Sequence, residues 1–141
     1  MILNWRWEMQ KIEQRRIKTP LGTLTLVASV QGMRAILFEG QSSESSSRSD
    51  RETSPDHPIL LACEAELREY FAGNRRRFDV PLEAQGTEFQ QKVWRSLLQI
   101  PFGSTWSYQE QARYLGMASA VRAVAAANGR NPLPILIPCH R

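Results

Sequence analysis

Cysteine is scarce in this sequence, and its spacing excludes the common metal sites. The two cysteines, Cys63 and Cys139, lie far apart, and neither has a second cysteine at the short spacing of a zinc site. In a reducing compartment a disulfide between them is not expected either. Each cysteine therefore has to be explained by packing or by chemistry, and we predict neither a bound metal nor a cofactor.

Long hydrophobic runs are also missing. No apolar stretch approaches the roughly 20 residues that a membrane-spanning helix needs. Near the N-terminus, residues 5–8 (Trp-Arg-Trp-Glu) interrupt the apolar core that a signal peptide would require. The sequence therefore predicts a cytoplasmic protein without membrane attachment. Its 141 residues, 42% of them hydrophobic, suffice for one compact domain or for two small lobes.

Positive charge is in excess, with a net charge of +4 and an isoelectric point near 9.5. This balance fits a polyanionic partner such as DNA, because each Lys or Arg placed on a phosphate releases condensed counterions. Groups such as Arg15 and Arg16, or Arg75, Arg76 and Arg77, are more often solvated faces than binding sites. Composition alone leaves both interpretations open.

The first half of the chain predicts a small sheet followed by a helix. Strands are expected at 16–19, 23–28 and 34–38, where branched and apolar residues are bounded by Gly and Pro. Residues 40–57 are Ser-rich and predict a disordered loop that buries nothing. Apolar residues then recur at helical spacing over 58–72, with Cys63 on the stripe as a core residue. The boundary between lobes is expected within 75–86.

The second half predicts three short helices. Thr87 and Gln90 form a capping-box pattern for a helix over 88–99, and Ser107 with Glu110 repeats the spacing before a helix that Gly116 closes. We expect Ser119 to cap a third helix over 120–128. The last two form a helix-turn-helix candidate. The final helix is almost all small residues around Arg122, which suits close approach to a surface or an ordinary packed helix.

A short apolar run precedes the second cysteine. Residues 135–137 predict a buried strand that delivers Cys139 to the edge of the core. A cysteine is nucleophilic as the thiolate, and the imidazole of His140 is a candidate base for its proton. Adjacency alone does not establish this chemistry, because neighbouring side chains of an extended segment point in opposite directions.

Several motifs nevertheless recur together in a fixed order. They are Ser107-Tyr108-Gln109, Arg122-Ala123-Val124, Asn128-Gly129, Asn131-Pro132 and the terminal Ile135-Leu136-Ile137-Pro138-Cys139-His140-Arg141. In order and spacing they resemble the O6-alkylguanine-DNA alkyltransferase family. Residues 87–141 carry the strong resemblance, whereas the N-terminal half agrees mainly in its expected strands and in Thr19-Pro20-Leu21-Gly22.

The resemblance implies an α+β fold. Residues 1–80 would form a ribonuclease H-like lobe with an antiparallel sheet and a helix, and residues 87–141 a mostly helical lobe with the helix-turn-helix. It also implies the activity of a methylated-DNA-protein-cysteine S-methyltransferase. A monomer would bind double-stranded DNA that contains O6-alkylguanine, with O4-alkylthymine as a second candidate, and would move the alkyl group irreversibly onto its own cysteine.

The family's site residues can be carried over where the motifs match. Cys139 would be the alkyl acceptor and His140 the water-linked base that sustains its thiolate. Arg122 would enter the duplex through the minor groove and fill the space of the flipped base. Its small neighbours Ala123 and Ala126 would allow close approach of the helix to DNA.

Two further residues would support the site. Tyr108 would press on the phosphate beside the lesion and donate a hydrogen bond to the flipped guanine, and Asn131 would brace the turn before Cys139. The plainer alternatives are a core aromatic for Tyr108 and an ordinary Asn-Pro turn for Asn131.

The sequence also departs from the family pattern. It stops at Arg141, whereas family members continue with a loop over the alkyl group and a helix whose Glu orients the histidine. We therefore expect a truncated or incomplete member with weakened transfer. The first rival is a non-catalytic protein that binds alkylated DNA. A helix-turn-helix regulator would want polar base-reading side chains in place of the alanines, and a cysteine hydrolase would need an oxyanion hole that the sequence does not identify.

Overall fold

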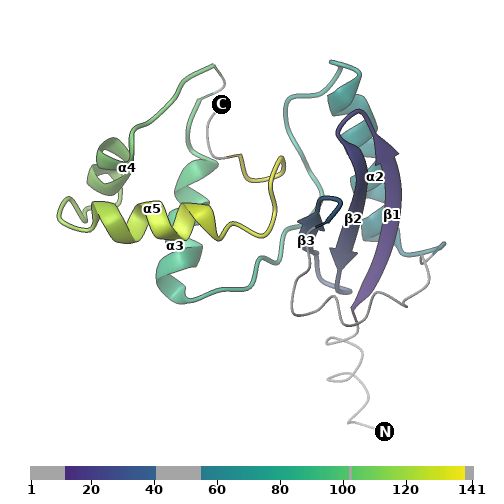
Figure 1. Cartoon of the computed structure of the whole chain (residues 1–141), viewed down its shortest axis with the longest axis horizontal. Coiled ribbons are helices and arrows are strands. Elements are labelled where there is room, and N and C mark those ends of the chain that lie inside the picture. The colour runs from purple at the N-terminus through teal and green to yellow at the C-terminus, as the bar shows by residue number, and fades with distance from the viewer. Residues whose placement is uncertain (1–11, 41–54, 102, 139–141) are drawn as a thin grey trace, which may run out of the picture. The chain divides into compact units, whose positions relative to one another are not determined.

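The computed structural model describes residues 12–40, 55–101 and 103–138, which belong to two compact units (Figure 1). The first unit is Met1–Glu83 and the second is Ala84–Arg141. Within these described ranges, a sheet and a helix belong to the first unit and three helices to the second. The predicted α+β class is confirmed by these elements.

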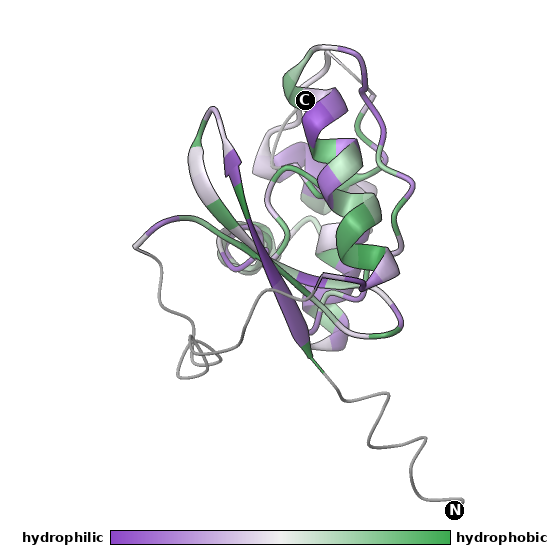
Figure 2. Ribbon diagram, turned by 90° about the vertical axis from the view of Figure 1, so that its right-hand side faces the viewer, coloured by the Kyte–Doolittle hydropathy of each residue, from purple (hydrophilic) through white to green (hydrophobic). Residues whose placement is uncertain are grey.

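The sheet of the first unit is a three-stranded antiparallel meander. Strands β1 (Glu13–Thr19), β2 (Gly22–Ala28) and β3 (Met33–Leu37) pair in the order β1-β2-β3, as the sequence predicted. Strand β1 begins three residues before its expected start, because pairing with β2 extends to Glu13 opposite Ala28 and overrides the poor strand propensity of its first residues. Figure 2 shows that β1 is largely hydrophilic, so this unit draws its core mainly from β2 and from the helix.

Helix α2 (Pro58–Phe71) packs on this sheet and contacts all three strands. Leu60, Cys63 and Leu67 are fully buried at the spacing predicted from the sequence. His57 caps the helix, since its Nδ1 accepts a hydrogen bond from the Leu60 amide at 3.4 Å. His57 is itself buried, so the expectation that 40–57 buries nothing is wrong at its last residue; residues 41–54 of that loop lie outside the described residues.

Cys63 is confirmed as a core residue, and its environment predicts an unreactive thiol. Burial, with the negative charges of Glu66 and Glu64 as smaller causes, raises the pKa of Cys63 to about 12. At pH 8 the thiolate is then about one part in 10⁴ of the thiol. We expect iodoacetamide to leave the Cys63 peptide unmodified in the native protein and to modify it fully in urea, as read by peptide mass. Rapid native labelling of Cys63 would contradict this burial.

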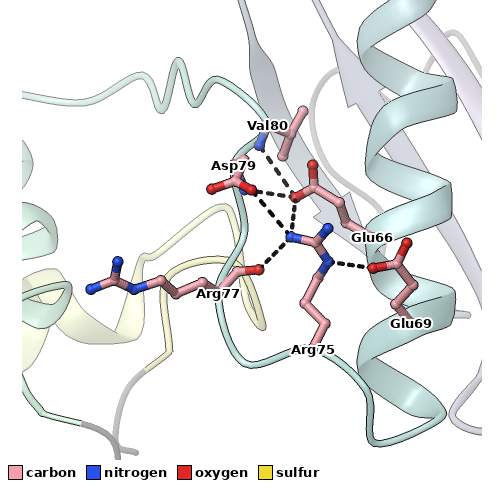
Figure 3. A network of polar contacts seen from close by, with 6 residues as sticks. All are labelled: Glu66, Glu69, Arg75, Arg77, Asp79 and Val80. Atoms are coloured by element: carbon pink, nitrogen blue, oxygen red, sulfur yellow. Dashed lines mark hydrogen bonds and ion pairs between the residues drawn. The ribbon is translucent and has the colours of Figure 1, made fainter.

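One arginine of the basic group at 75–77 is neutralised within its own unit (Figure 3). Arg75 donates through Nε to Glu69 at 2.8 Å and through Nη1 to the Arg77 carbonyl at 2.8 Å, and Asp79 lies 3.4 Å away. The Glu69 hydrogen bond is the largest cause of a raised pKa of Arg75. The Arg75 guanidinium therefore organises a loop, and the solvated-face interpretation needs this correction.

A buried carboxylate completes that loop. Glu66 of α2 accepts backbone hydrogen bonds from Asp79 at 2.8 Å and from Val80 at 3.3 Å, and its carboxylate lies 3.9 Å from Arg75. Figure 3 shows these groups converging on Glu66. A buried carboxylate is tolerated where backbone donors and a cation satisfy it, which is the case here.

The second unit consists of helices α3 (Glu88–Leu97), α4 (Tyr108–Tyr114) and α5 (Val121–Gly129). The capping box that opens α3 is confirmed, with Gln90 N donating to Thr87 Oγ1 at 3.1 Å and Thr87 N donating to Gln90 Oε1 at 2.9 Å. Gly116 ends α4 at φ +72°, a left-handed conformation that glycine adopts without strain. Among the described residues, none of the helices combines the length and hydropathy that a membrane span requires.

Two local predictions for this unit are wrong. Ser119 does not cap α5; Ala120 occupies the cap position and no side chain bonds to the first turn. The expected strand at 135–137 is a turn, in which Ile137 N donates to Leu133 O at 2.8 Å. Pro132 and Pro134 provide no amide donors for a strand ladder, and Ile135 adopts φ +75°, a strained value for a β-branched residue.

Candidate nucleic-acid interface

Helices α4 and α5 pack against each other and form the helix-turn-helix (Figure 1). One face of α5 is exposed. Arg122, Ala123 and Ala126 are exposed on that face, while Val124 and Ala127 are buried on the opposite one. The pattern follows the helical period, so the small side chains and the arginine share one side. In the described part of the chain, no hydrogen bond or ion pair holds the Arg122 guanidinium. A flat helix surface with one long cationic side chain results.

The buried side of α5 is fastened to α3. The Trp94 indole donates from Nε1 to the Ala127 carbonyl at 2.8 Å, and both residues are almost fully buried. The Ala127 carbonyl, in the last turn of α5, also accepts from the Arg130 amide at 3.1 Å, so the indole is its second donor. The hydrogen bond of the buried Trp94 indole thus gives α5 a specific anchor on α3.

A second set of buried polar groups joins all three helices of this unit. Gln111 of α4 and Asn128 of α5 exchange side-chain hydrogen bonds, and Gln111 Nε2 also donates to Val93 O at 3.2 Å and to Ser96 Oγ at 2.9 Å on α3. Gln111, Ser96 and Asn128 are all less than 5% exposed. Sequence reasoning missed this cluster. Its signal was the position of Gln111 and Asn128 on the apolar faces of their helices.

Tyr108 is the first residue of α4 and is 51% exposed. The core-aromatic alternative for Tyr108 is therefore wrong. The ring of Trp106, which lies just before the helix, contacts the ring of Tyr114, the last residue of the helix, with centroids 4.9 Å apart. Within the described ranges no hydrogen bond holds the Tyr108 phenol, so it is accessible to an external group on the unit that carries α5.

Asn131 joins the two sides of the turn before Cys139. Its Oδ1 accepts from Leu133 N at 2.9 Å and its Nδ2 donates to the Ile137 carbonyl at 2.5 Å. One side chain therefore closes the loop from 131 to 137, with Leu133, Leu136 and Ile137 buried. The side chain of Asn131 does more than form a local Asn-Pro turn, because it reaches the residue next to Pro138.

The two residues expected to carry the chemistry, Cys139 and His140, lie outside the described residues. The described chain reaches Pro138, directly before them. Within the described residues there is no group of three or more His, Cys, Asp or Glu side chains that could bind a metal ion. The described part of the candidate site thus consists of the α4–α5 helix pair and the Asn131 turn that ends at Pro138.

Two features together define the DNA alkyltransferase class of protein. One is a helix-turn-helix whose second helix carries small residues and one arginine. The other is a turn, closed by an Asn side chain, that leads into Pro-Cys-His-Arg. The chain belongs to the 6-O-methylguanine DNA methyltransferase family. Residues 14–84 match that family's ribonuclease-like domain, and residues 88–141 match its DNA binding domain. The family resemblance predicted from the sequence motifs is confirmed.

Similar proteins agree with this assignment. The methylated-DNA-protein-cysteine methyltransferase of Mycobacterium tuberculosis is 42% identical over 130 residues, which are 92% of this chain and 77% of that protein. The constitutive enzyme of the same name from Bacillus subtilis is 42% identical over 129 residues, 88% of this chain and 76% of that protein. The crystal structure of M. tuberculosis OGT in complex with DNA has a TM-score of 0.76 and 39% identity, covering 90% of this chain and 75% of that one.

Proposed function

We propose that this protein repairs DNA directly, by moving the alkyl group of O6-alkylguanine onto Cys139 in a single, irreversible turnover. The observation that carries the proposal is the α5 face, where Arg122 projects from a surface of small residues on the same unit as the braced turn into Cys139. Residues 87–141 then bind DNA and carry the acceptor. Family membership supports the reaction class, a methylated-DNA-protein-cysteine S-methyltransferase.

The reaction balances without a cofactor. His140 accepts the Cys139 proton through a water, and the thiolate attacks the alkyl carbon in line with the bond to O6. The carbon-sulfur bond forms as the carbon-oxygen bond breaks, and the electron pair of that bond stays on the guanine. A proton then enters at guanine N1, so normal guanine is restored. The thioether is stable, so one protein molecule repairs one lesion.

Access to O6 requires the alkylated base to leave the duplex. Extrusion costs a few kcal/mol, which contacts made only in the flipped state must offset. Arg122 occupies the vacated space from the minor groove, and Ala123 and Ala126 let the α5 backbone approach the DNA. Because the Arg122 guanidinium has no partner among the described residues, its insertion breaks no internal ion pair.

Tyr108 and Asn131 complete the proposed site. The exposed phenol of Tyr108 presses on the phosphate beside the lesion and donates a hydrogen bond to the extruded guanine. Asn131 holds the turn that carries Cys139 through its two hydrogen bonds. We assign the protein to the cytoplasm, where a reducing milieu keeps the acceptor thiol free.

The test is mass spectrometry of the protein after incubation with a duplex that contains O6-methylguanine. We expect the intact mass to rise by one methylene and the added mass to map to the Cys139 peptide. The Cys63→Ala variant is the matched control and should gain the same mass, because Cys63 is buried with a raised pKa. An undamaged duplex should add nothing.

Two other outcomes contradict the proposal. Tight binding of the lesion with no added mass would favour the alternative, a protein that recognises alkylated DNA without repairing it. Equal affinity for damaged and undamaged duplexes, again with no added mass, would leave a general DNA-binding protein.

A further inference from the structure

Gln111 and Asn128 make the only side-chain amide pair buried among the described residues of the second unit. Asn128 Nδ2 donates to Gln111 Oε1 at 2.6 Å, and Gln111 Nε2 donates back to Asn128 Oδ1 at 3.3 Å. Gln111 is 2% and Asn128 4% exposed. A buried pair of this kind is stable only when every member is satisfied, and its geometry then admits few alternatives.

The α3 partners fix which way both amides face. Val93 O can only accept, and Ser96 donates its own hydroxyl proton to Val93 O at 2.5 Å, which leaves Ser96 Oγ as an acceptor. The amino group of Gln111 must therefore point at α3, and its carbonyl must accept from Asn128. Rotating either amide by half a turn would set like groups against each other. The cluster thus has one consistent arrangement.

The position of Asn128 gives this arrangement a consequence for the site. Asn128 lies in the last turn of α5, six residues after Arg122 and three residues before Asn131. On one side of it the helix carries the arginine; on the other, the Asn131 turn leads to Cys139. Fixing Asn128 therefore fixes the point in the chain at which the helix and the turn meet.

We infer that Gln111 and Asn128 are positioning residues that set the register between the helix bearing Arg122 and the turn bearing Cys139. This inference rests on the proposed function for its purpose. Neither residue needs to touch DNA, because both act through the backbone of α5. The pair keeps the separation of Arg122 and Cys139 constant. This separation must match the distance between the space that the flipped base leaves in the duplex and the position that the base takes beside the cysteine. Loss of the pair lets the end of α5 and the turn shift independently.

The test replaces both amides by apolar side chains of similar size, in the double variant Gln111→Met with Asn128→Leu. Removing both partners leaves no unsatisfied amide in the pair, so the fold is retained. We expect the rate constant for transfer from a duplex lesion to fall by roughly 10- to 100-fold, since a misplacement of about 1 Å costs on the order of 100-fold. Transfer from a free O6-benzylguanine base, which needs no flipping, should fall by less than about threefold.

Hydrogen exchange provides a readout that does not depend on activity. The Leu133 and Ile137 amides, which are bonded in the turn, should exchange faster in the double variant while the thermal unfolding midpoint changes little. Gln99→Met is the matched control, because it replaces an exposed amide of the same unit in the same way and leaves the buried amide pair and its α3 partners intact. It should match the wild type in transfer from a duplex lesion and in exchange at the turn.

Asn128→Asp is a second variant that keeps the size of the side chain. It sets an oxygen against Gln111 Oε1 in place of the donor at 2.6 Å, so it should reproduce the loss. Unchanged exchange and unchanged duplex transfer in both variants would overturn the inference, and so would an equal loss with duplex and free base. Failure of the wild type to transfer would instead contradict the proposed function, while the exchange data would still decide the role of the pair.

Discussion

Cys139→Ala abolishes alkyl transfer and leaves DNA binding nearly intact. Alanine offers no nucleophile, so no thioether forms and no mass is added after incubation with the O6-methylguanine duplex. Binding should change by less than about threefold, because in the proposed site the contacts to DNA come from α5 and Tyr108 and not from the sulfur. Parallel measurements of intact mass and of equilibrium affinity for the lesion duplex check both halves of the expectation.

The Cys139→Ser variant tests whether the loss of transfer comes from the missing thiolate or from the smaller side chain of alanine. A serine hydroxyl has nearly the same size as the thiol but ionises far less readily, so it also fails to attack the alkyl carbon. Cys63→Ala is the matched control, since it removes the other thiol and should transfer at the wild-type rate. Mass added to the Cys139→Ala protein would place the acceptor elsewhere and contradict the assignment. A large loss of affinity would show that Cys139 supports the fold of the binding surface.

The helical periodicity of the sequence predicted most of the fold because each element buries one clear face. Helix α3 is the best case, since the Thr87 and Gln90 capping pattern marks its start and Val93 and Trp94 mark its buried side. The meander was also predicted, apart from the first residues of β1, whose pairing is decided by β2 and not by local propensity. Elements with a single consistent period are those that sequence reasoning recovers.

Residues 135–137, which belong to the turn at 131–137, were predicted as a strand because a run of three apolar residues has no period of its own. Its conformation is set by side-chain hydrogen bonds from Asn131 and by the prolines on either side, and these depend on three-dimensional closure. The Gln111 and Asn128 pair was missed for a related reason, since a polar residue on a buried face reveals a partner only after the helices are packed. The sequence motif thus indicated the chemistry, whereas the hydrogen bonds that position the motif could be identified only in the folded structure.

Arg122→Ala is expected to reduce base flipping much more than DNA binding. If the guanidinium supplies about 2 kcal/mol of the cost of extrusion, its removal lowers the flipped population by roughly 30-fold, whereas loss of one surface cation weakens binding to undamaged DNA by only a few-fold. A fluorescent base analogue beside the lesion reports extrusion, and the rate constant for methyl transfer should fall in proportion.

The matched control for this prediction is Arg130→Ala, which removes the same charge from the exposed C-cap of α5. It should weaken binding as much as Arg122→Ala but leave the flipped fraction unchanged, because its side chain lies beyond the end of the helix that approaches the duplex. Arg122→Lys keeps the charge and loses the planar group, so it should recover binding fully and flipping in part. Equal flipping in Arg122→Ala and wild type would remove this arginine from the site and return α5 to an ordinary packed helix.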